Sequence, residues 1–199
     1  MSIEFTRGPN VYLRELVPAD LENIKNSLVD WEQFPFSIDK TKNYLKGLLT
    51  TLRYIERPYT NDTQCREIFT ICKNSDDSFV GFTQVSIFPG KIAEIKATAS
   101  LTSLRGQGYM NEAALIRDAA LFTELGCNSY TTKHDTAQIH SLRAYQTLTG
   151  TEFSSVRQKD LKLVEATLAS WNTWKANNPS SIPSYTFSGG SYTPPHLRT

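Results

Sequence analysis

Two glycines stand one residue apart in the stretch LRGQGYMNEAAL, residues 104–115, directly after an arginine. The residues that follow predict a helix, so Gly106 and Gly108 lie just before its N-terminus. Glycine has no Cβ and lets a ligand approach the backbone closely. A helix N-terminus presents free N–H groups and about half a positive charge. These features together predict an anion site, most often for phosphate, although the same glycines also suit a plain turn before a helix.

Three strands are predicted directly before this loop. The stretches REIFTICK (66–73), SFVGFTQVSIF (78–88) and KIAEIKATASLT (91–102) are separated by the turn sequences NSDD and PG. Short turns between consecutive strands are typical of an antiparallel meander. The glycine loop is therefore expected at the end of the third strand of a meander.

The elements on either side predict a mixed sheet. VYLREL, residues 11–16, alternates apolar and polar side chains as a half-buried strand does. We further expect helices at about 17–28, 39–52, 109–125 and 136–148, with Gly126 ending the third, and strands at 128–134 and 151–156. This order predicts an α+β fold, a mixed and mostly antiparallel sheet with helices on both faces.

The C-terminal part is predicted to begin with a helix at 158–177. It would carry one apolar stripe, formed by Leu161, Val164, Leu168 and Trp171. The residues after it are rich in Ser, Pro, Thr and Gly and predict one strand or hairpin and then a frayed end. We divide the chain into a main domain, 1–157, and a segment, 158–199, that packs on the same domain or forms an interface.

Composition excludes several classes of protein. The chain has 199 residues, 39% of them hydrophobic and 21% charged, which suits one packed domain with or without appendages. A net charge of +1 disfavours a general nucleic-acid binder. No apolar run approaches the roughly 20 residues needed to span a bilayer, and MSIEFTRGPN has no signal-peptide core. We therefore expect a cytoplasmic protein with no membrane partner.

Cysteine and histidine usage points the same way. Cys65, Cys72 and Cys127 form no CxxC motif, which fits a reducing compartment, and we expect them to be buried as small apolar residues. The three histidines, His134, His140 and His196, lack the spacing of a metal site. We expect no bound metal.

This layout, together with the glycine motif, resembles the GNAT superfamily of N-acetyltransferases over about residues 11–153. Within it the sequence is most similar to the ribosomal-protein-alanine acetyltransferase branch. The likeness rests on the order and spacing of three stretches: VYLRELVPADLENI, AEIKATASLTSLRGQGYMNEAALIRDAALFTELGCNSY and QIHSLRAYQTL. It implies a GNAT-like fold for the sheet described above.

The resemblance implies acetyl-coenzyme A as cofactor and coenzyme A as product. The family loop, Arg/Gln-x-x-Gly-x-Gly/Ala, binds the pyrophosphate through backbone N–H groups. It is matched by Arg105, Gly106, Gln107, Gly108, Tyr109 and Met110, with Asn111 beginning the adjacent helical turn. Met110 replaces Gly or Ala, so its side chain must point away from the cofactor. The thioester carbonyl is expected on the N–H of Ala99, Ser100 or Leu101.

Other phosphate-binding motifs fit less well. A Walker A loop needs a Gly-Lys-Ser/Thr ending, which this chain lacks. A dinucleotide-binding loop follows a parallel strand near the N-terminus, whereas this loop follows an antiparallel meander.

A second family pattern, Asn-x-x-Ser-x-x-x-Tyr, is matched by Gln138, Ser141 and Tyr145. The tyrosine follows the serine by four residues, so both share one helix face. The resemblance implies that Gln138 and Ser141 lie along the pantetheine and that Tyr145 protonates the leaving thiolate. The alternative is that Tyr145 simply packs in the core.

The general base is left open among several residues. Glu94 matches a glutamate that family members often carry on this strand, acting directly or through a water, although it could equally be solvated or paired with Lys96. Ser100 could order a water, and Asp135 ends the next predicted strand.

The resemblance places the acceptor near DWEQFPFS, residues 30–37, where Trp31, Phe34 and Phe36 would form an apolar wall. Asp30 and Glu32 would attract a cationic amine. These aromatic residues could instead staple the first helices to the sheet.

The implied activity is direct transfer of an acetyl group to a primary amine of a protein N-terminus, a lysine or a small molecule. A non-catalytic acyl-coenzyme A-binding or protein-interaction module is one alternative. A GNAT enzyme acting on nucleic acid is another, with a basic rim from Arg143, Arg157, Lys159 and Lys162. The expected partners are a small-molecule acetyl donor and an amine acceptor, protein or small molecule, and a homodimer stays open.

Overall fold

One mixed sheet forms the centre of the molecule. The computed structural model describes residues 4–29, 65–88, 90–135 and 161–188. Its strands lie in the order β7-β6-β5-β4-β3-β2-β1-β8. Their bounds are β1 Glu4–Arg7, β2 Val11–Glu15, β3 Cys65–Lys73, β4 Phe79–Phe88, β5 Ile92–Ser100, β6 Ser129–Asp135, β7 Leu161–Thr167 and β8 Thr186–Phe187. Among these, β5 and β6 run parallel and every other neighbouring pair runs antiparallel, which confirms the predicted fold class.

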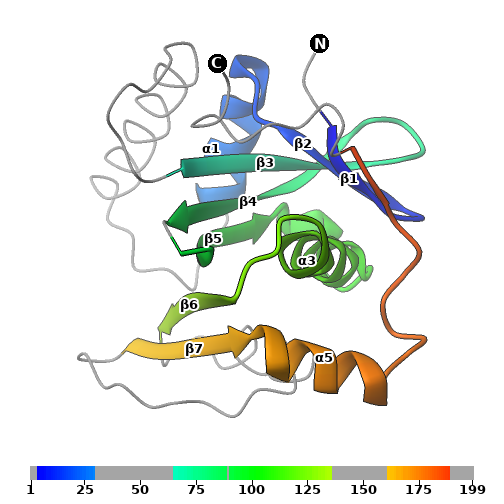
Figure 1. Cartoon of the computed structure of the whole chain (residues 1–199). Coiled ribbons are helices and arrows are strands. Elements are labelled where there is room, and N and C mark those ends of the chain that lie inside the picture. The colour runs from blue at the N-terminus through cyan, green and yellow to red at the C-terminus, as the bar shows by residue number, and fades with distance from the viewer. Residues whose placement is uncertain (1–3, 30–64, 89, 136–160, 189–199) are drawn as a thin grey trace.

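Helices cover both faces of this sheet (Figure 1). On one face lie α3 (Tyr109–Ala119), its continuation as a π turn η3 (Ala120–Glu124), and α5 (Leu168–Asn177). The other face carries the 3₁₀ turn η1 (Pro18–Asp20) and α1 (Leu21–Val29). Gly126 follows η3 with φ +64°, a left-handed conformation that ends the helix as the sequence predicts.

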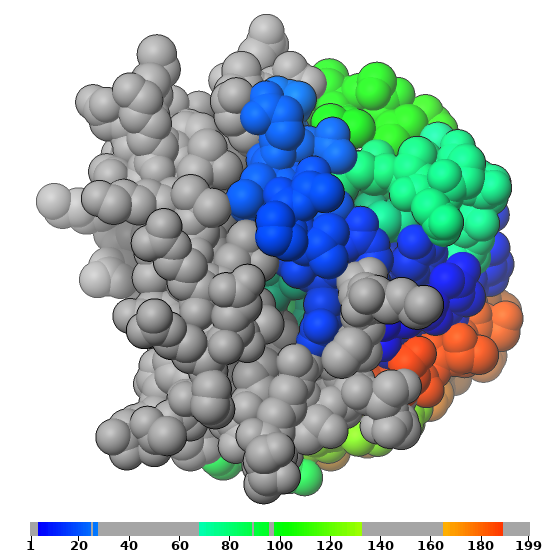
Figure 2. Space-filling view, turned by 90° about the horizontal axis from the view of Figure 1, so that it is seen from above, coloured from blue at the N-terminus to red at the C-terminus, as the bar shows by residue number. Residues whose placement is uncertain are grey.

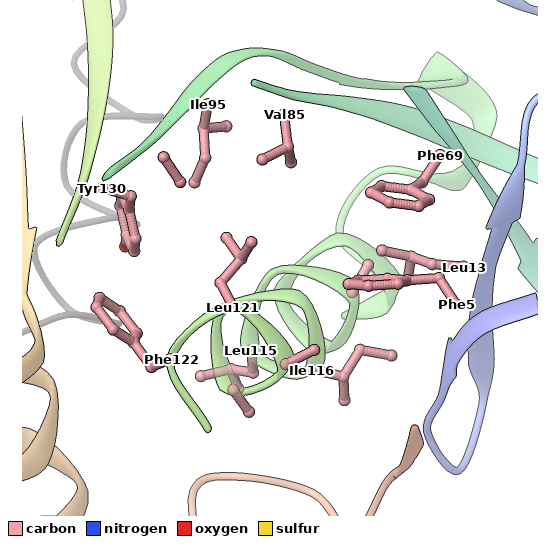
Figure 3. Packing of buried hydrophobic residues seen from close by; sticks show 14 of the residues in the cluster. Phe5, Leu13, Phe69, Val85, Ile95, Leu115, Ile116, Leu121, Phe122 and Tyr130 are labelled. Atoms are coloured by element: carbon pink, nitrogen blue, oxygen red, sulfur yellow. The ribbon is translucent and has the colours of Figure 1, made fainter. Parts of the chain in front are cut away.

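The two faces have separate apolar clusters because strand side chains alternate between them. The larger cluster lies under α3: Phe5, Leu13 and Phe69 pack at one end, Phe122 and Tyr130 at the other (Figure 3). The smaller cluster joins α1 to the opposite face through Leu16, Ile24, Ile68, Phe79, Phe82 and Ala99. The consecutive residues Ile68 and Phe69 of β3 thus serve different faces.

An ion pair fixes the start of α1 to the sheet. Arg14 donates two hydrogen bonds to Asp20, at 2.7 and 2.8 Å, and Thr70 donates a third at 2.8 Å. The Val17 N–H adds a fourth at 3.0 Å. Burial alone would raise the pKa of Asp20, but these hydrogen bonds together outweigh it, so the pKa lies below its usual value.

The predicted helix at 158–177 is wrong in its first half. Residues 161–167 form strand β7, which pairs with the whole length of β6, and the helix begins only at Leu168. Thr167 is its N-cap: its hydroxyl accepts from the Ser170 N–H at 3.1 Å, and the Ser170 hydroxyl accepts from the Thr167 N–H at 3.0 Å. Leu161 and Val164 therefore lie on a strand and share no helical stripe with Trp171.

Two short strands close the far edge: β1, which the sequence pattern did not predict, and β8, which lies in the C-terminal segment predicted to hold one strand or hairpin. β1 pairs with β2 on one side and with β8 on the other. The Thr6 hydroxyl also donates to the Thr186 carbonyl at 3.0 Å, across 180 residues of sequence. In the space-filling view the orange-red segment lies against the dark blue first strands (Figure 2).

Three predicted elements lie outside the described residues: the helices at 39–52 and 136–148 and the strand at 151–156. Within the described part of the chain, no helix is both long and apolar enough to cross a membrane.

Candidate active site

The glycine loop is an open backbone cradle between β5 and α3. It follows a 3₁₀ turn, η2 (Thr102–Leu104), and passes through an extended Arg105. Gly106 and Gly108 have φ values of +76° and +83°, which L side chains rarely adopt. A Cβ on either glycine would meet no atom within 4 Å. The glycines are therefore needed for the loop's shape, and the space beside their backbone is open to a ligand.

The N-terminus of α3 offers unpaired donors to this loop. Gly108 is the N-cap and provides no side-chain cap. The first intrahelical bond runs from the Glu112 N–H to the Gly108 carbonyl at 3.0 Å. The N–H groups of Tyr109, Met110 and Asn111 thus have no acceptor within the helix, and the helix dipole adds positive potential there. This arrangement suits an anion.

Side chains on both sides hold the cradle in place. Met110 and Tyr109 are half-buried and pack against the larger core, so Met110 does not fill the loop. Gln107 donates to the Ser103 carbonyl at 3.2 Å. The Lys73 ammonium lies 5.5 Å from the centre of the Tyr109 ring and adds positive charge nearby. Arg105 is exposed.

Glu112, in the first turn of α3, clamps this helix to the β1–β2 turn. Its carboxylate accepts from the Asn10 N–H at 2.7 Å, the Asn10 side-chain amide at 2.8 Å and the Val11 N–H at 3.0 Å. A Cβ at Gly8 would lie 2.6 Å from the same carboxylate. These hydrogen bonds tie the first turn of α3, which directly follows the glycine cradle, to the turn between β1 and β2.

Strands β5 and β6, the third and second strands from one edge of the sheet, part after a short stretch of pairing. Their parallel pairing runs from Ile92–Ser129 to Ile95–Thr132, and β6 then continues beside β7 alone. The β4–β5 register shifts at the same place, where Lys96 is the extra residue of a bulge. From there to its end at Ser100, β5 forms no described ladder pair on its β6 side.

The bulge and the ladder decide which N–H groups face this gap. The Leu101 N–H donates to the Val80 carbonyl at 3.0 Å, so those two residues form a hydrogen-bonded pair with β4. Such pairs alternate along an antiparallel ladder, which directs the Ala99 N–H toward β4 as well. The N–H groups of Thr98 and Ser100 point to the opposite edge, toward the gap. Thr98 was not among the residues predicted from sequence, because a one-residue bulge cannot be located in the sequence pattern.

Gly81 lets β4 approach β5 closely at this level. It lies opposite Ser100, and a Cβ there would collide with the Ala99 carbonyl oxygen. The glycine thus permits the local strand geometry that presents the end of β5.

Glu94 and Ser100 do not come together. Ala93 and Ile95 belong to the larger cluster, so Glu94 between them faces the α1 side, whereas Ser100 shares the α3 side with Thr98. Six residues of strand separate Glu94 from Ser100, about 20 Å at 3.3 Å per residue. Glu94 pairs with Thr131, directly before the strands part. Ser86 lies across from Glu94, and its buried hydroxyl has no hydrogen-bond partner.

Most of the remaining predicted site residues lie outside the described part of the chain. Those outside the described residues are Gln138, Ser141, Tyr145, Trp31, Phe34 and Phe36, together with Asp30, Glu32, Arg143, Arg157 and Lys159. Asp135 is the last residue of β6 and Lys162 lies in β7, opposite His134.

A buried ion pair behind the gap was missed by the sequence reasoning. Arg117 and Asp118 of α3 are only 1% and 2% exposed, and they bond to each other and to side chains of three strands. Complete burial raises the pKa of Asp118. The signal in the sequence is an Arg-Asp dipeptide inside an otherwise apolar helix.

Within the described part of the chain we find neither a reactive cysteine nor a cluster of side chains that could bind a metal. Cys72 and Cys127 are buried, and burial raises the pKa of Cys127 to about 11, so its thiol stays protonated and unreactive. No cluster of three His, Cys, Asp or Glu side chains among these residues could hold a metal ion.

Comparison with known proteins shows which family has this arrangement of strands, helices and glycine loop. The model of the acetyltransferase (GNAT) domain matches residues 10–150. No curated protein matches the chain. Among solved structures, apo FdhC, a nucleotide-linked sugar GNAT, has a TM-score of 0.66 at 13% identity and covers 92% of this chain and 98% of its own.

Two further structures share the fold. An acetyltransferase of the GNAT family from Bacillus anthracis has a TM-score of 0.61 at 14% identity, covering 83% of this chain and 99% of its own. A spermidine N-acetyltransferase chimera of Vibrio cholerae SpeG and hSSAT has a TM-score of 0.59 at 14% identity, covering 82% and 99%. At these identities the likeness establishes the fold alone.

Proposed function

Since the chain belongs to the GNAT acetyltransferase family, we propose that it transfers an acetyl group from acetyl-coenzyme A directly to a primary amine. The observation that carries the proposal is the open glycine cradle at the N-terminus of α3, next to strands that part. An anion cradle and a gap with free strand donors are what a phosphate-bearing, amide-rich cofactor requires.

The residues present fit such a cofactor. The N–H groups from Gly106 to Asn111 would hold the two phosphates, since the Arg105 N–H donates to the Thr102 carbonyl, and no Cβ obstructs the cradle. The N–H groups of Thr98 and Ser100 would pair with amide and thioester carbonyls in the gap, since those of Ala99 and Leu101 are directed to β4. When bound, acetyl-coenzyme A supplies the activated acetyl group as a thioester.

The chain's own groups would move two protons. An amine attacks only as the free base, so one proton must leave the acceptor nitrogen, and Glu94 lies on the α1 face beside the gap to take it, directly or through a water. The departing thiolate needs a proton, and we assign Tyr145 to donate it. Holding both reactants in one gap supplies several kcal/mol of the barrier reduction through proximity.

We assign the acceptor to a chemical class, the primary amines, and name no single compound. Trp31, Phe34 and Phe36 are assigned to its apolar wall, and Asp30 and Glu32 to attraction of its positive charge. One structural neighbour acetylates spermidine and another is a nucleotide-linked sugar GNAT, so both small-molecule classes belong in a screen. The ribosomal-protein-alanine branch adds a peptide N-terminus.

Cofactor binding is tested with Gly108→Asp, which places a carboxylate against the predicted phosphate position. Acetyl-coenzyme A at a hundredfold excess over the parent Kd should stabilise the parent by about 2.7 kcal/mol and raise its Tm. The variant should show no such shift. Gly90→Asp is the matched control, because Gly90 has φ +82° and equally open surroundings but lies in the β4–β5 turn.

The control should keep the full ligand-induced shift despite the same backbone strain. An equal shift in Gly108→Asp would show that the loop is only a turn.

Turnover is tested by thiol release from acetyl-coenzyme A with a panel of spermidine, an amino sugar nucleotide, an Ala-starting peptide and a lysine peptide. Thiol release with one amine class and mass gain of one acetyl group on that amine are expected. Binding with no turnover would instead favour an acyl-coenzyme A-binding module.

A further inference from the structure

Arg117 and Asp118 form a fully buried ion pair inside α3. The Arg117 guanidinium donates to one Asp118 oxygen through Nε at 2.8 Å and Nη2 at 2.7 Å. A buried pair of this kind contributes little net stability compared with well-packed apolar side chains. Both residues lie near the C-terminal end of α3, more than two helical turns from the glycine cradle at its N-terminus.

Further hydrogen bonds join the pair to three strands. Arg117 Nη1 donates to the Thr83 hydroxyl of β4 at 3.0 Å and to the Thr98 hydroxyl of β5 at 3.4 Å. The Tyr130 hydroxyl of β6 donates to the second Asp118 oxygen at 3.0 Å. Figure 3 shows the Tyr130 ring pointing from its strand toward α3, beside Phe122.

These contacts bracket the point at which the sheet opens. The last β5–β6 pair is Ile95–Thr132; Thr98 lies three residues beyond it on one strand and Tyr130 two residues before it on the other. The pair therefore connects both strands to one helix: Thr98 of β5 lies beyond the last β5–β6 ladder pair, whereas Tyr130 of β6 lies just inside the ladder, opposite Ala93. The same helix begins at the glycine cradle.

We propose that Arg117 and Asp118 are positioning residues that fix the separation of β5 and β6, and with it the place of the thioester relative to the acceptor amine. This inference rests on the proposed function. Acyl transfer depends on alignment, and a misplacement of about 1 Å can lower the rate on the order of a hundredfold. Neither residue touches the reactants.

The test compares two variants that each lose one buried hydroxyl. One hydroxyl lies beside the gap between β5 and β6, and the matched one lies on the α1 face of the sheet. Tyr130→Phe deletes the bond from β6 to Asp118. Thr70→Val deletes a buried hydroxyl that donates at 2.8 Å to Asp20, a carboxylate likewise held by an arginine, but on the α1 face. Both residues are fully buried, so the two changes should lower Tm to a similar degree.

Activity is measured well below both melting points, with the best amine of the panel. We expect kcat to fall about tenfold to a hundredfold in Tyr130→Phe while the Kd for acetyl-coenzyme A changes less than about threefold. Thr70→Val should keep the parent kcat. Amide exchange of residues 96–100 should also quicken in Tyr130→Phe only, a readout that needs no turnover.

Thr98→Val provides a second variant if Tyr130→Phe does not fold, because it releases β5 from Arg117 and should lower kcat in the same way. The inference would be overturned if Tyr130→Phe, or Thr98→Val in its place, showed the same kcat and the same amide exchange of residues 96–100 as Thr70→Val. A parent protein that neither binds nor uses acetyl-coenzyme A would overturn the proposed function instead.

Discussion

At the scale of single residues, the candidate site depends on backbone groups more than on side chains. Gly106 and Gly108 shape a loop whose N–H groups are the binding atoms. Thr98 and Ser100 likewise present N–H groups toward the gap. The sequence identifies the glycines because few other residues adopt a positive φ, but it does not reveal which strand N–H groups are free.

Tyr145→Phe should lower turnover by about 10- to 10³-fold, the scale of one general-acid contribution, because it removes the proton donor and keeps the ring. The Kd for acetyl-coenzyme A should barely change, since thiolate charge develops only in the transition state. Both quantities are measured beside Tyr185→Phe, whose hydroxyl bonds to Glu124 at 3.1 Å on an exposed surface.

The control variant should match the parent in rate. A rate equal to that of the parent in Tyr145→Phe would remove this tyrosine from the mechanism.

At the scale of elements, the meander and the glycine-loop helix follow from the sequence, and the C-terminal elements follow only in part. The alternating strands around NSDD and PG are found as predicted, because turn chemistry and period-two patterning agree there. The apolar side chains of residues 161–167 fit the period of a helix as well as that of a strand, and pairing with β6 makes this segment a strand. The Thr167 and Ser170 capping pair was the missed local sign of where the helix starts.

Trp171→Ala should destabilise the protein by about 3–5 kcal/mol, as loss of a buried aromatic side chain does. Trp171 is 2% exposed and stacks between Phe122 and Trp174, with ring centres 5.5 and 5.4 Å away. Urea unfolding of this variant and of Asn172→Ala, an exposed neighbour in α5, measures the difference.

Asn172→Ala should unfold close to the parent. Should Trp171→Ala do the same, α5 would contribute nothing to the core.

At the scale of the whole molecule, each face of the sheet carries, within the described residues, a buried aspartate paired with an arginine, and the two aspartates respond oppositely to pH. The pKa of Asp20 is below its usual value in the folded protein, so its contribution to stability is present above the unfolded pKa of about 3.9. That contribution is lost as pH falls through the lower, folded pKa. The pKa of Asp118 is raised, so its effect is the reverse: its contribution to stability is lost as the pH rises through the folded pKa.

Urea unfolding of the parent and of Asp20→Asn from pH 7 to pH 3 isolates the effect of Asp20 on stability. The parent should lose more stability than the variant as the pH falls, because only the parent carries the depressed carboxylate. Asp20→Asn should be the less stable protein at pH 7, where it leaves Arg14 without its charged partner. Parallel pH curves for the two proteins would contradict the assignment.

The pairing of β1 with β8 has a kinetic consequence. Joining Thr6 to Thr186 closes a loop of 180 residues, and such non-local contacts form late because the chain entropy is lost before the contact is gained. β8 has only two residues and two ladder pairs. We expect it to dock last during refolding and to detach first under mild denaturant. Pulse-labelling exchange should then find the Ser188 N–H, bonded to the Phe5 carbonyl, protected after the amides of β3 and β4.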